Sequence, residues 1–414
     1  MKRRVVITGL GVIAPNGIGK ERFWSALVNG KSGIGKVTRF DASTYPSQIA
    51  GEVNNFDPTD YMSPKSARRT DRYSQFAVAC AKRAVEDARL KISHQNENRI
   101  GNVIGSAVGG LGFAEEQHSI FVEKGIKRIS PFLAISLFPG AASSQIGIEL
   151  GTKGYSNTLA SGCAAGTDAI GHAFHSLRSG LADVILAGGV EAPIAPLTFG
   201  SFCVSGALST HRNDDPEKAS RPFDKDRDGF VMSEGAGIVV LEELHHAMNR
   251  GANIYAEILA YGTNSDGHHM AHPLPNGDQT EKVIRETLQD ANLQPNHISY
   301  INAHGTSTII NDSIETKVIK RIFREYAYDI PISATKSMTG HSMGAGGAIE
   351  MIASVLCITH QFVHPTINLN TPDPECDLDY VPSKGRSAEV NVVLSNSLSF
   401  GGKNAVLIIS RFKE

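Results

Sequence analysis

One cysteine and two histidines stand in short turns made of glycine, alanine and hydroxyl residues. Cys163 lies within Leu159–Gly171, where small residues flank the thiol and a helix-forming run begins directly after it. The positive end of a helix dipole favours thiolate over thiol, so this position predicts a nucleophile. His304 and His341 each lie in a glycine-rich turn beside a predicted strand end, where α/β proteins usually place ligands. Each residue alone could be structural, but the three together indicate a catalytic thiol assisted by imidazoles.

The other four cysteines lack this setting, and we interpret them as structural: Cys80, Cys203, Cys357 and Cys376. Five cysteines form neither an even set nor a CxxC pair, which argues against a disulfide framework. The count favours a reducing, cytoplasmic compartment.

The elements that must position these residues alternate along the chain, which predicts an α/β protein with largely parallel or mixed sheets. The predicted strands are Arg4–Thr8, Asn102–Gly105, Asp183–Ala187, Gly237–Leu241, Ile254–Tyr261, Tyr300–Ala303, Val390–Ser395 and Ala405–Ile409. The predicted helices include Glu21–Asn29, Pro64–Leu90, Gly166–Ser179, Leu244–Arg250, Glu281–Ala291, Ser313–Phe323 and Ala345–Thr359. A turn at 250–253 is the best internal boundary, and it divides the chain into residues 1–250 and 251–414.

The predicted helix from Pro64 carries a basic face ahead of its apolar stripe. Its cations recur at three-to-four spacing, which places them on one side: Lys65, Arg68, Arg69 and Arg72. The face is either a solvated helix end or a docking patch for an acidic protein.

Composition and charge exclude several classes of protein. Hydrophobic residues make up 41% and charged residues 20% of the 414-residue chain, which is typical of a globular protein. A net charge of -2 argues against a nucleic-acid binder. The basic start and Val5–Ala14 superficially resemble a signal peptide, but the glycines within the run predict a first β-strand. We expect no membrane span; the stretch Phe132–Ile148 comes closest.

Two familiar motifs are matched only in part. Gly9–Ala14 follows a strand like a dinucleotide fingerprint, but Pro15–Gly17 breaks the helix that would have to face a pyrophosphate. Asp224–Gly229 opens like a calcium-binding loop, yet its twelfth position is Gly235 instead of glutamate. We interpret the second segment as a charged structural turn and expect no metal site and no nicotinamide cofactor.

With these motifs in view, nearly the whole chain resembles the elongating β-ketoacyl-[acyl-carrier-protein] synthases of the thiolase-like superfamily. The likeness runs from the first strand to Asn396–Asn404 and includes the segments Arg221–Asp224, Gly229–Met232 and Glu234–Gly237. The resemblance implies a five-layered αβαβα fold of two similar halves, a homodimer, and no bound cofactor. It also implies decarboxylative condensation of an acyl group with a malonyl unit, both carried on the phosphopantetheine of an acidic acyl carrier protein.

The resemblance also implies residue roles. Cys163 would carry the acyl chain as a thioester, and two neutral imidazoles, His304 and His341, would stabilise the enolate left when CO2 departs. The backbone N–H groups of Cys163 and Phe400 would form the oxyanion hole. Lys336 and Glu350 would be a supporting ion pair. Thr306 and Thr308 would contact the phosphopantetheine arm, while Lys65, Arg68 and Arg69 would dock the carrier protein. The acyl-binding positions would be Val108, Ala134, Gly162, Phe202 and Ser399.

Several positions depart from the family pattern. Ser399 stands where glycine is usual and should stiffen a gating loop, and Lys403 replaces threonine or histidine. Ala271 and Gly206 each lack a side chain expected to contact pantetheine or the carrier protein. The acyl-channel positions Val108, Ala134 and Gly162 are each smaller than the commoner residue, which predicts a pocket that accepts long or methyl-branched chains.

Four other functions compete with this interpretation. A polyketide ketosynthase would use the same chemistry on a different acyl chain, and the departures from the family pattern leave this alternative open. A thiolase would need a second catalytic cysteine near the C-terminus, but no cysteine follows Cys376. A non-catalytic chain-length partner would not need Cys163, His304 and His341 together. A cysteine hydrolase would leave the second histidine turn unexplained.

Overall fold

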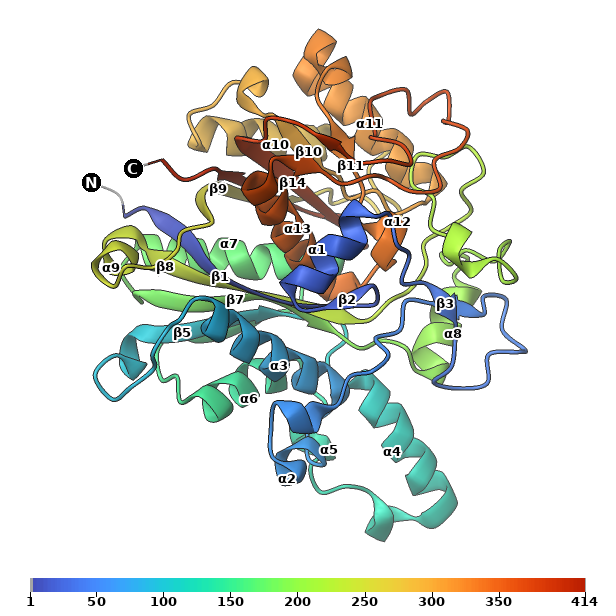
Figure 1. Cartoon of the computed structure of the whole chain (residues 1–414). Coiled ribbons are helices and arrows are strands. Elements are labelled where there is room, and N and C mark those ends of the chain that lie inside the picture. The colour runs from blue at the N-terminus through green and yellow to red at the C-terminus, as the bar shows by residue number, and fades with distance from the viewer. Residues whose placement is uncertain (1–2, 414) are drawn as a thin grey trace.

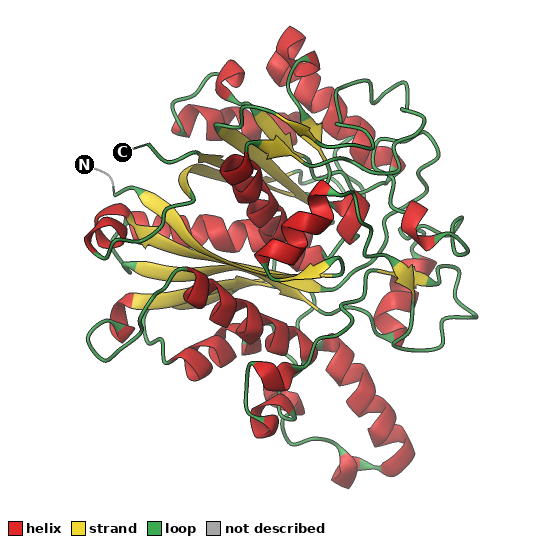
Figure 2. Cartoon of the chain, viewed as in Figure 1, coloured by secondary structure: helices red, strands yellow, loops and turns green. Residues whose placement is uncertain are grey.

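Ten strands form the central framework of the molecule, seen in a computed structural model that describes residues 3–413 (Figures 1 and 2). The first five lie side by side in the order β6 (Ser156–Leu159), β5 (Ile100–Gly105), β7 (Val184–Glu191), β8 (Gly235–Glu243) and β1 (Val5–Ala14). The other five follow as β9 (Ala256–Ser265), β15 (Lys403–Ser410), β14 (Val392–Ser399), β10 (Tyr300–Asn302) and β11 (Ile332–Ser333). The two groups meet where β1 pairs antiparallel with β9, Val5 opposite Ile258.

Helices divide these strands into layers (Figure 1). The helices α3 (Arg72–Asp87) and α6 (Ala141–Leu150) cover the outer face of the first group of strands. The helices α10 (Asp278–Asp290) and α11 (Ile309–Phe323) cover the second group. Between the two groups lie α7 (Ala165–Arg178) and α13 (Gly346–His360), in contact with each other. This is the five-layered αβαβα arrangement predicted from the resemblance.

Shorter elements complete the chain. The remaining helices are α1 (Lys20–Val28), α2 (Pro64–Ala67), α4 (Leu111–Lys124), α5 (Leu133–Ser136), α8 (Pro196–Val204), α9 (Leu244–Asn249) and α12 (Lys336–Thr339). The remaining strands are β2 (Gly17–Ile18), β3 (Gly35–Lys36), β4 (Ile49–Ala50), β12 (Phe362–Val363) and β13 (Arg386–Ser387). The helices α4 and α5 project from the body beside α2 (Figure 1).

The glycines at the start of the chain allow a helix to approach β1 closely. A Cβ atom on Gly9 would lie 2.2 Å from the carbonyl oxygen of Ala84, and one on Gly11 would lie 2.0 Å from that of Cys80. Both carbonyls belong to α3, so these glycines serve packing between a strand and a helix. The strand also continues to Ala14, in agreement with the predicted first strand and with the rejection of a dinucleotide motif.

The predicted helix Pro64–Leu90 is wrong in one respect, because the structure breaks it into α2 and α3. The Asp71 carboxylate accepts the Tyr73 N–H at 2.9 Å and so begins a new helix. Arg72 then turns inward and holds both carboxylate oxygens of Glu234 at 2.8 Å. The basic face therefore loses Arg72, and its exposed members are Lys65, Arg68 and Arg69.

The core helix α13 accounts for the most apolar stretch of the chain. Within residues 3–413, Met343–His360 is the one helix long and apolar enough by length and composition to cross a membrane, and 89% of it is buried inside the protein. The expectation that Phe132–Ile148 comes closest was wrong, because the turn at Pro139 and Gly140 separates α5 from α6 there.

The charged turn after Arg221 is structural, as predicted. Asp224 is fully buried, pairs with the Arg221 Nε at 2.9 Å, and accepts the backbone N–H groups of Asn370 and Thr371 at 2.8 and 2.9 Å. These bonds attach the turn to the loop that follows β12.

Candidate active site

Cys163 lies in a 3-10 turn, Gly162–Ala164, between β6 and α7. Its side chain is buried, with 8% of its surface exposed. Burial raises the pKa of the Cys163 thiol to about 11. The Ser399 hydroxyl, the positive charge of Lys336 and the Phe400 N–H all act in the opposite direction. The predicted preference for thiolate was therefore wrong for this state, because desolvation of the thiol outweighs its place before a helix.

His304 follows β10, at the end where the parallel strands β10 and β11 both finish, while the neighbouring β14 continues to Ser399. The buried Glu315 of α11 holds this turn, since its carboxylate accepts the N–H of His304 at 2.7 Å and that of Gly305 at 2.9 Å. His341 follows α12 and donates its own N–H to the carbonyl of Val231 at 2.7 Å. Two backbone anchors thus fix the direction of the imidazoles.

One imidazole contacts the thiol, and the other lies beside it. Nε2 of His341 lies 3.1 Å from Sγ of Cys163, and the His304 and His341 rings stand perpendicular with centroids 5.5 Å apart. Burial and the nearby charge of Lys336 hold the pKa of both histidines well below 6.5. Both rings are therefore neutral at physiological pH, as the resemblance implies. Phe230 meets His341 edge to face at 5.2 Å and closes one side of the group.

Lys336 connects the histidines to the core. Its ammonium group donates to the backbone carbonyl oxygen of His304 at 2.8 Å and lies 3.3 Å from Nδ1 of the His304 ring. A lysine ammonium only donates, so Nδ1 accepts and the hydrogen of the neutral His304 ring belongs on Nε2. Lys336 also forms a buried ion pair with Glu350 of α13. Burial raises the pKa of Glu350 to about 7, against the lowering effect of Lys336.

The turn between β14 and β15 lies over the thiol. The Phe400 N–H lowers the pKa of the Cys163 thiol, against the effect of burial. The Cys163 N–H, the other predicted donor, instead donates to Oγ of Ser399 at 2.8 Å. The Phe400 ring is 44% exposed and stacks on Phe202 with centroids 6.4 Å apart. Ser399 and Phe400 thus cover the nucleophile together.

The predicted substrate-binding residues are only partly brought together. Val108 and Phe202 pack in one apolar cluster with Phe230 and Met343, next to His341. Thr306 and Thr308 lie beside His304 with their hydroxyls 2.9 Å apart.

One of the acyl-channel expectations needs correction, and another stays a prediction. Within the single chain, Ala134 is exposed on α5, in the projecting part of the chain, and does not join the cluster around Val108, so its place along the acyl channel stays a prediction. Gly162 frees no room, because a Cβ atom there would lie 2.3 Å from Oγ of Ser399. The volume that an alanine methyl would fill at position 162 already holds the serine hydroxyl.

Glu191 is a residue that sequence reasoning missed. It ends β7, is fully buried, and accepts the backbone N–H groups of Ala107 at 2.6 Å, Val108 at 3.2 Å and Gly344 at 3.0 Å. Its carboxylate thus ties the Val108 turn to the turn that follows His341. The signal available in the sequence was a single acidic residue at the end of an otherwise apolar strand. Glu315 was missed for the same reason, as an acid within an apolar helix.

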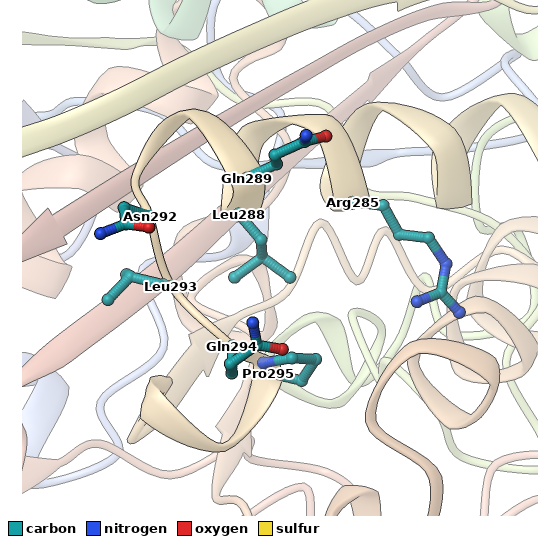
Figure 3. Close-up of a pocket in the computed structure, with 7 residues that line it drawn as sticks. All are labelled: Arg285, Leu288, Gln289, Asn292, Leu293, Gln294 and Pro295. Atoms are coloured by element: carbon teal, nitrogen blue, oxygen red, sulfur yellow. The ribbon is translucent and has the colours of Figure 1, made fainter.

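The hollow shown in Figure 3 lies away from this site, between α10 and the turn that follows it. It is lined by Arg285, Leu288, Gln289, Asn292, Leu293, Gln294 and Pro295. None of these residues was predicted to be functional.

A buried thiol, two neutral imidazoles and an αβαβα fold together define the class of acyl-transferring condensing enzymes. Residues 2–247 match the family model "Beta-ketoacyl synthase, N-terminal domain", and residues 255–370 match "Beta-ketoacyl synthase, C-terminal domain". The chain belongs to the β-ketoacyl synthase family, as its motifs predicted. The proposed division at residue 250 stays a prediction.

Full-length relatives extend the assignment. The chain is 48% identical over 412 residues to the 3-oxoacyl-[acyl-carrier-protein] synthase 2 of Synechocystis sp., covering 100% of this chain and 99% of the relative. It is 46% identical to the enzyme of the same name from Staphylococcus aureus, covering 99% of each. This likeness confirms the predicted reaction class, acyl transfer in fatty-acid elongation.

Solved structures confirm the fold. A ketosynthase described as part of a type II polyketide complex with its acyl-carrier protein superposes with a TM-score of 0.92 at 38% identity, covering 100% of both chains. A β-ketoacyl synthase from Burkholderia phymatum gives a TM-score of 0.92 at 33% identity, again covering 100% of both chains. The solved polyketide ketosynthase is 38% identical to this chain, whereas the fatty-acid synthases named above are 46% and 48% identical. The comparison therefore favours the fatty-acid enzymes over the polyketide alternative.

Proposed function

We propose that this chain condenses an acyl group, held as a thioester on Cys163, with malonyl-[acyl-carrier protein] to give 3-oxoacyl-[acyl-carrier protein]. The observation that carries the proposal is the 3.1 Å contact between the Cys163 thiol and His341, with His304 beside it and Lys336 behind it. The single thiol and two neutral imidazoles match a reaction that needs one nucleophile and then two donors to an enolate.

The first half-reaction loads the enzyme. The sulfur of Cys163 attacks the thioester carbonyl of the incoming acyl group, the new S–C bond forms, and the bond to the pantetheine sulfur breaks. The thiol proton leaves through the His341 contact and reaches the departing pantetheine sulfur. Burial raises the pKa of the thiol, so we expect proton transfer to accompany the attack.

The second half-reaction forms the carbon–carbon bond. Loss of CO2 from the malonyl group leaves its bonding electron pair as an enolate, whose oxygen is stabilised by hydrogen bonds from the neutral imidazoles. The enolate carbon then attacks the Cys163 thioester, the C–C bond forms, and the cysteine sulfur departs and takes a proton from solvent, the one proton that the condensation consumes. Lys336 serves this step as a positioning residue, because it keeps the hydrogen of His304 on Nε2.

Acyl loading and decarboxylation can be measured separately. Incubation with acyl-[acyl-carrier protein] should add one acyl mass to Cys163, and malonyl-[acyl-carrier protein] should then release CO2 with formation of the 3-oxoacyl product. A panel of straight and branched acyl groups would identify the preferred donor. Failure of every acyl-carrier thioester to acylate Cys163 would contradict the proposed function.

We propose that an acidic acyl carrier protein docks at Lys65, Arg68 and Arg69. All three side chains are exposed around α2, and Arg69 lies over the Phe132 ring at 4.7 Å. Substrates would arrive on the phosphopantetheine of that protein, with Thr306 and Thr308 beside its path, and no resident cofactor would be needed. We place the enzyme in the cytoplasm, a choice supported by five cysteines that are all free and buried.

We also propose that two copies of the chain associate. The strand β6 ends the sheet, so one of its edges is open to a second β6. The projecting part of the chain beside it exposes large apolar side chains at Phe121, Val122, Ile126, Ile135, Leu137 and Phe138. A second copy would cover this surface and Ala134 with it. Light scattering should show a dimer for the wild-type protein and a monomer for Val122→Glu. A monomeric wild-type protein would contradict the association.

A further inference from the structure

Gly162 and Ser399 form an unusual pair next to the nucleophile. Oγ of Ser399 accepts the Cys163 N–H at 2.8 Å, and a Cβ atom on Gly162 would approach that same oxygen to 2.3 Å. No real Cβ atom and hydroxyl oxygen can lie that close. The serine hydroxyl therefore fits only because position 162 has no side chain.

The serine oxygen occupies a functional position. When the thiol attacks a thioester, the carbonyl oxygen becomes negatively charged and needs hydrogen bonds from backbone N–H groups beside the cysteine. The family resemblance assigns these donors to the N–H groups of Phe400 and Cys163, and the Phe400 N–H lowers the pKa of the Cys163 thiol. One N–H cannot point directly at two oxygens at once, and a hydrogen bond weakens as its angle departs from linear. The substrate carbonyl and the Ser399 hydroxyl therefore compete for the Cys163 N–H.

The serine is held by more than this one bond. It is the last residue of β14, and the turn after it contains Gly401 and Gly402, both in the left-handed region at φ 79° and 69°. The Gly401 N–H donates to the carbonyl of Met270 at 2.6 Å, and the Gly402 carbonyl accepts the Asp266 N–H at 2.7 Å. Moving Ser399 with its backbone would break these contacts, whereas rotating its side chain would break only the bond to Cys163.

We propose that Ser399 is a positioning residue whose hydroxyl fills the oxyanion site of the resting enzyme, and that Ser399 and Gly162 act as an interlocking pair that controls acyl loading of Cys163. The proposal rests on the proposed function, because it concerns the loading half-reaction. It assigns to Ser399 a part in loading that is separate from the length of the acyl chain.

Four proteins test the pair: wild type, Gly162→Ala, Ser399→Gly and the double variant. The readout is the rate at which octanoyl-pantetheine acylates Cys163, followed by intact-protein mass. Ser399→Gly should load at least about threefold faster, because the Cys163 N–H is free. Gly162→Ala places a methyl where the serine hydroxyl lies, so it should displace the hydroxyl and free the same N–H, against the cost of φ 63°. The loss of loading rate caused by Gly162→Ala should therefore be at least about threefold smaller with Ser399 present than in the Ser399→Gly background.

The cycle separates the pair from simple backbone strain. Alanine at position 162 must adopt φ 63° in both backgrounds, so this cost cancels when the effect of Gly162→Ala is compared with and without Ser399. Equal effects in the two backgrounds would overturn the interlocking pair. Thermal unfolding of all four proteins shows whether any has failed to fold, and Ser399→Ala then supplies an independent test.

Ser399→Ala removes the hydroxyl and keeps the Cβ atom, so it isolates the competition from loop stiffness. It should raise the loading rate constant at saturating octanoyl-pantetheine at least about threefold while half-saturation stays within about twofold. Ser397→Ala is the matched control, because Ser397 is a buried serine of the same strand that bonds to Thr167 at 2.6 Å. Slower loading by Ser399→Ala would mean that the hydroxyl assists the attack, and would overturn the proposal. Wild type that is never acylated would instead contradict the proposed function.

Discussion

The Cys163 thiol and the His341 imidazole lie 3.1 Å apart, although 178 positions separate them in the chain. Each follows the same local design, a glycine turn that passes through a short 3-10 segment into a helix of the middle layer. Gly162–Ala164 leads into α7, and Met343–Ala345 leads into α13. Because α7 and α13 pack against each other, their first turns meet, and this contact assembles the site.

Cys163→Ala should abolish both acylation and condensation, because within residues 3–413 no other thiol forms a hydrogen bond with an imidazole. Cys203→Ala is the matched control, since Cys203 is 7% exposed against 8% for Cys163. Iodoacetamide mapping by mass spectrometry should label Cys163 first. Loss of activity in Cys203→Ala with retention in Cys163→Ala would refute the assignment of the nucleophile.

Loss of either imidazole should separate the two half-reactions. His304→Ala and His341→Ala should still accept some acyl group on Cys163, but each should lose about a hundredfold in CO2 release from malonyl-[acyl-carrier protein], since an oxyanion donor contributes about 3 kcal/mol. His360→Ala, which loses a ring stacked on Trp24, is the control. Normal CO2 release by both site variants would show that the histidines are only structural.

The pH dependence of alkylation follows from the pKa of the thiol. Since burial raises that pKa to about 11, the reactive thiolate is a small fraction at neutral pH and grows as pH rises. Between about pH 7 and about pH 9 the rate of Cys163 alkylation should increase about tenfold per unit, without a plateau. The pKa values of His304 and His341 lie well below 6.5, so no inflection from them is expected in this range. A plateau near neutral pH would show that the thiol is already ionised.

The docking patch can be tested by charge reversal. Changing Lys65, Arg68 and Arg69 to glutamate should raise KM for acyl-[acyl-carrier protein] about tenfold and flatten its dependence on salt. The small octanoyl-pantetheine substrate should be affected little. A control reverses three exposed cations elsewhere, at Lys282, Lys317 and Lys384. Equal losses on both substrates would mean that the patch acts through folding.

The sequence predicted the strands well where they are buried and apolar. The predicted strand Gly237–Leu241 lies inside β8, whereas β6 was missed because its Ser156–Leu159 residues are polar and partly exposed at the sheet edge. Cys163, His304 and His341 were recognisable from local composition. The relation between Gly162 and Ser399 was not, because it depends on a backbone approach between residues more than two hundred positions apart.

The acyl-chain preference is the prediction that the structure changes most. Smaller residues at three positions predicted a roomy channel, but Ser399 fills the space beside Gly162, and Ala134 lies outside the cluster in the single chain. Val108 is therefore the position where side-chain volume should govern chain length in the single chain. It packs with Phe202 in the apolar cluster next to His341.

Val108→Phe should shorten the accepted chain. A buried methylene contributes about 0.8 kcal/mol, so each carbon that no longer fits should lower kcat/KM about fourfold, which shifts the preference without making it absolute. The measurement compares kcat/KM for straight and branched acyl-[acyl-carrier proteins] from about six to about sixteen carbons. Wild type should accept the long and methyl-branched members, and Val108→Phe should lose the long ones first while loading the shortest normally. If wild type stops at about eight carbons, or if Val108→Phe leaves the length profile unchanged, Val108 does not limit the channel.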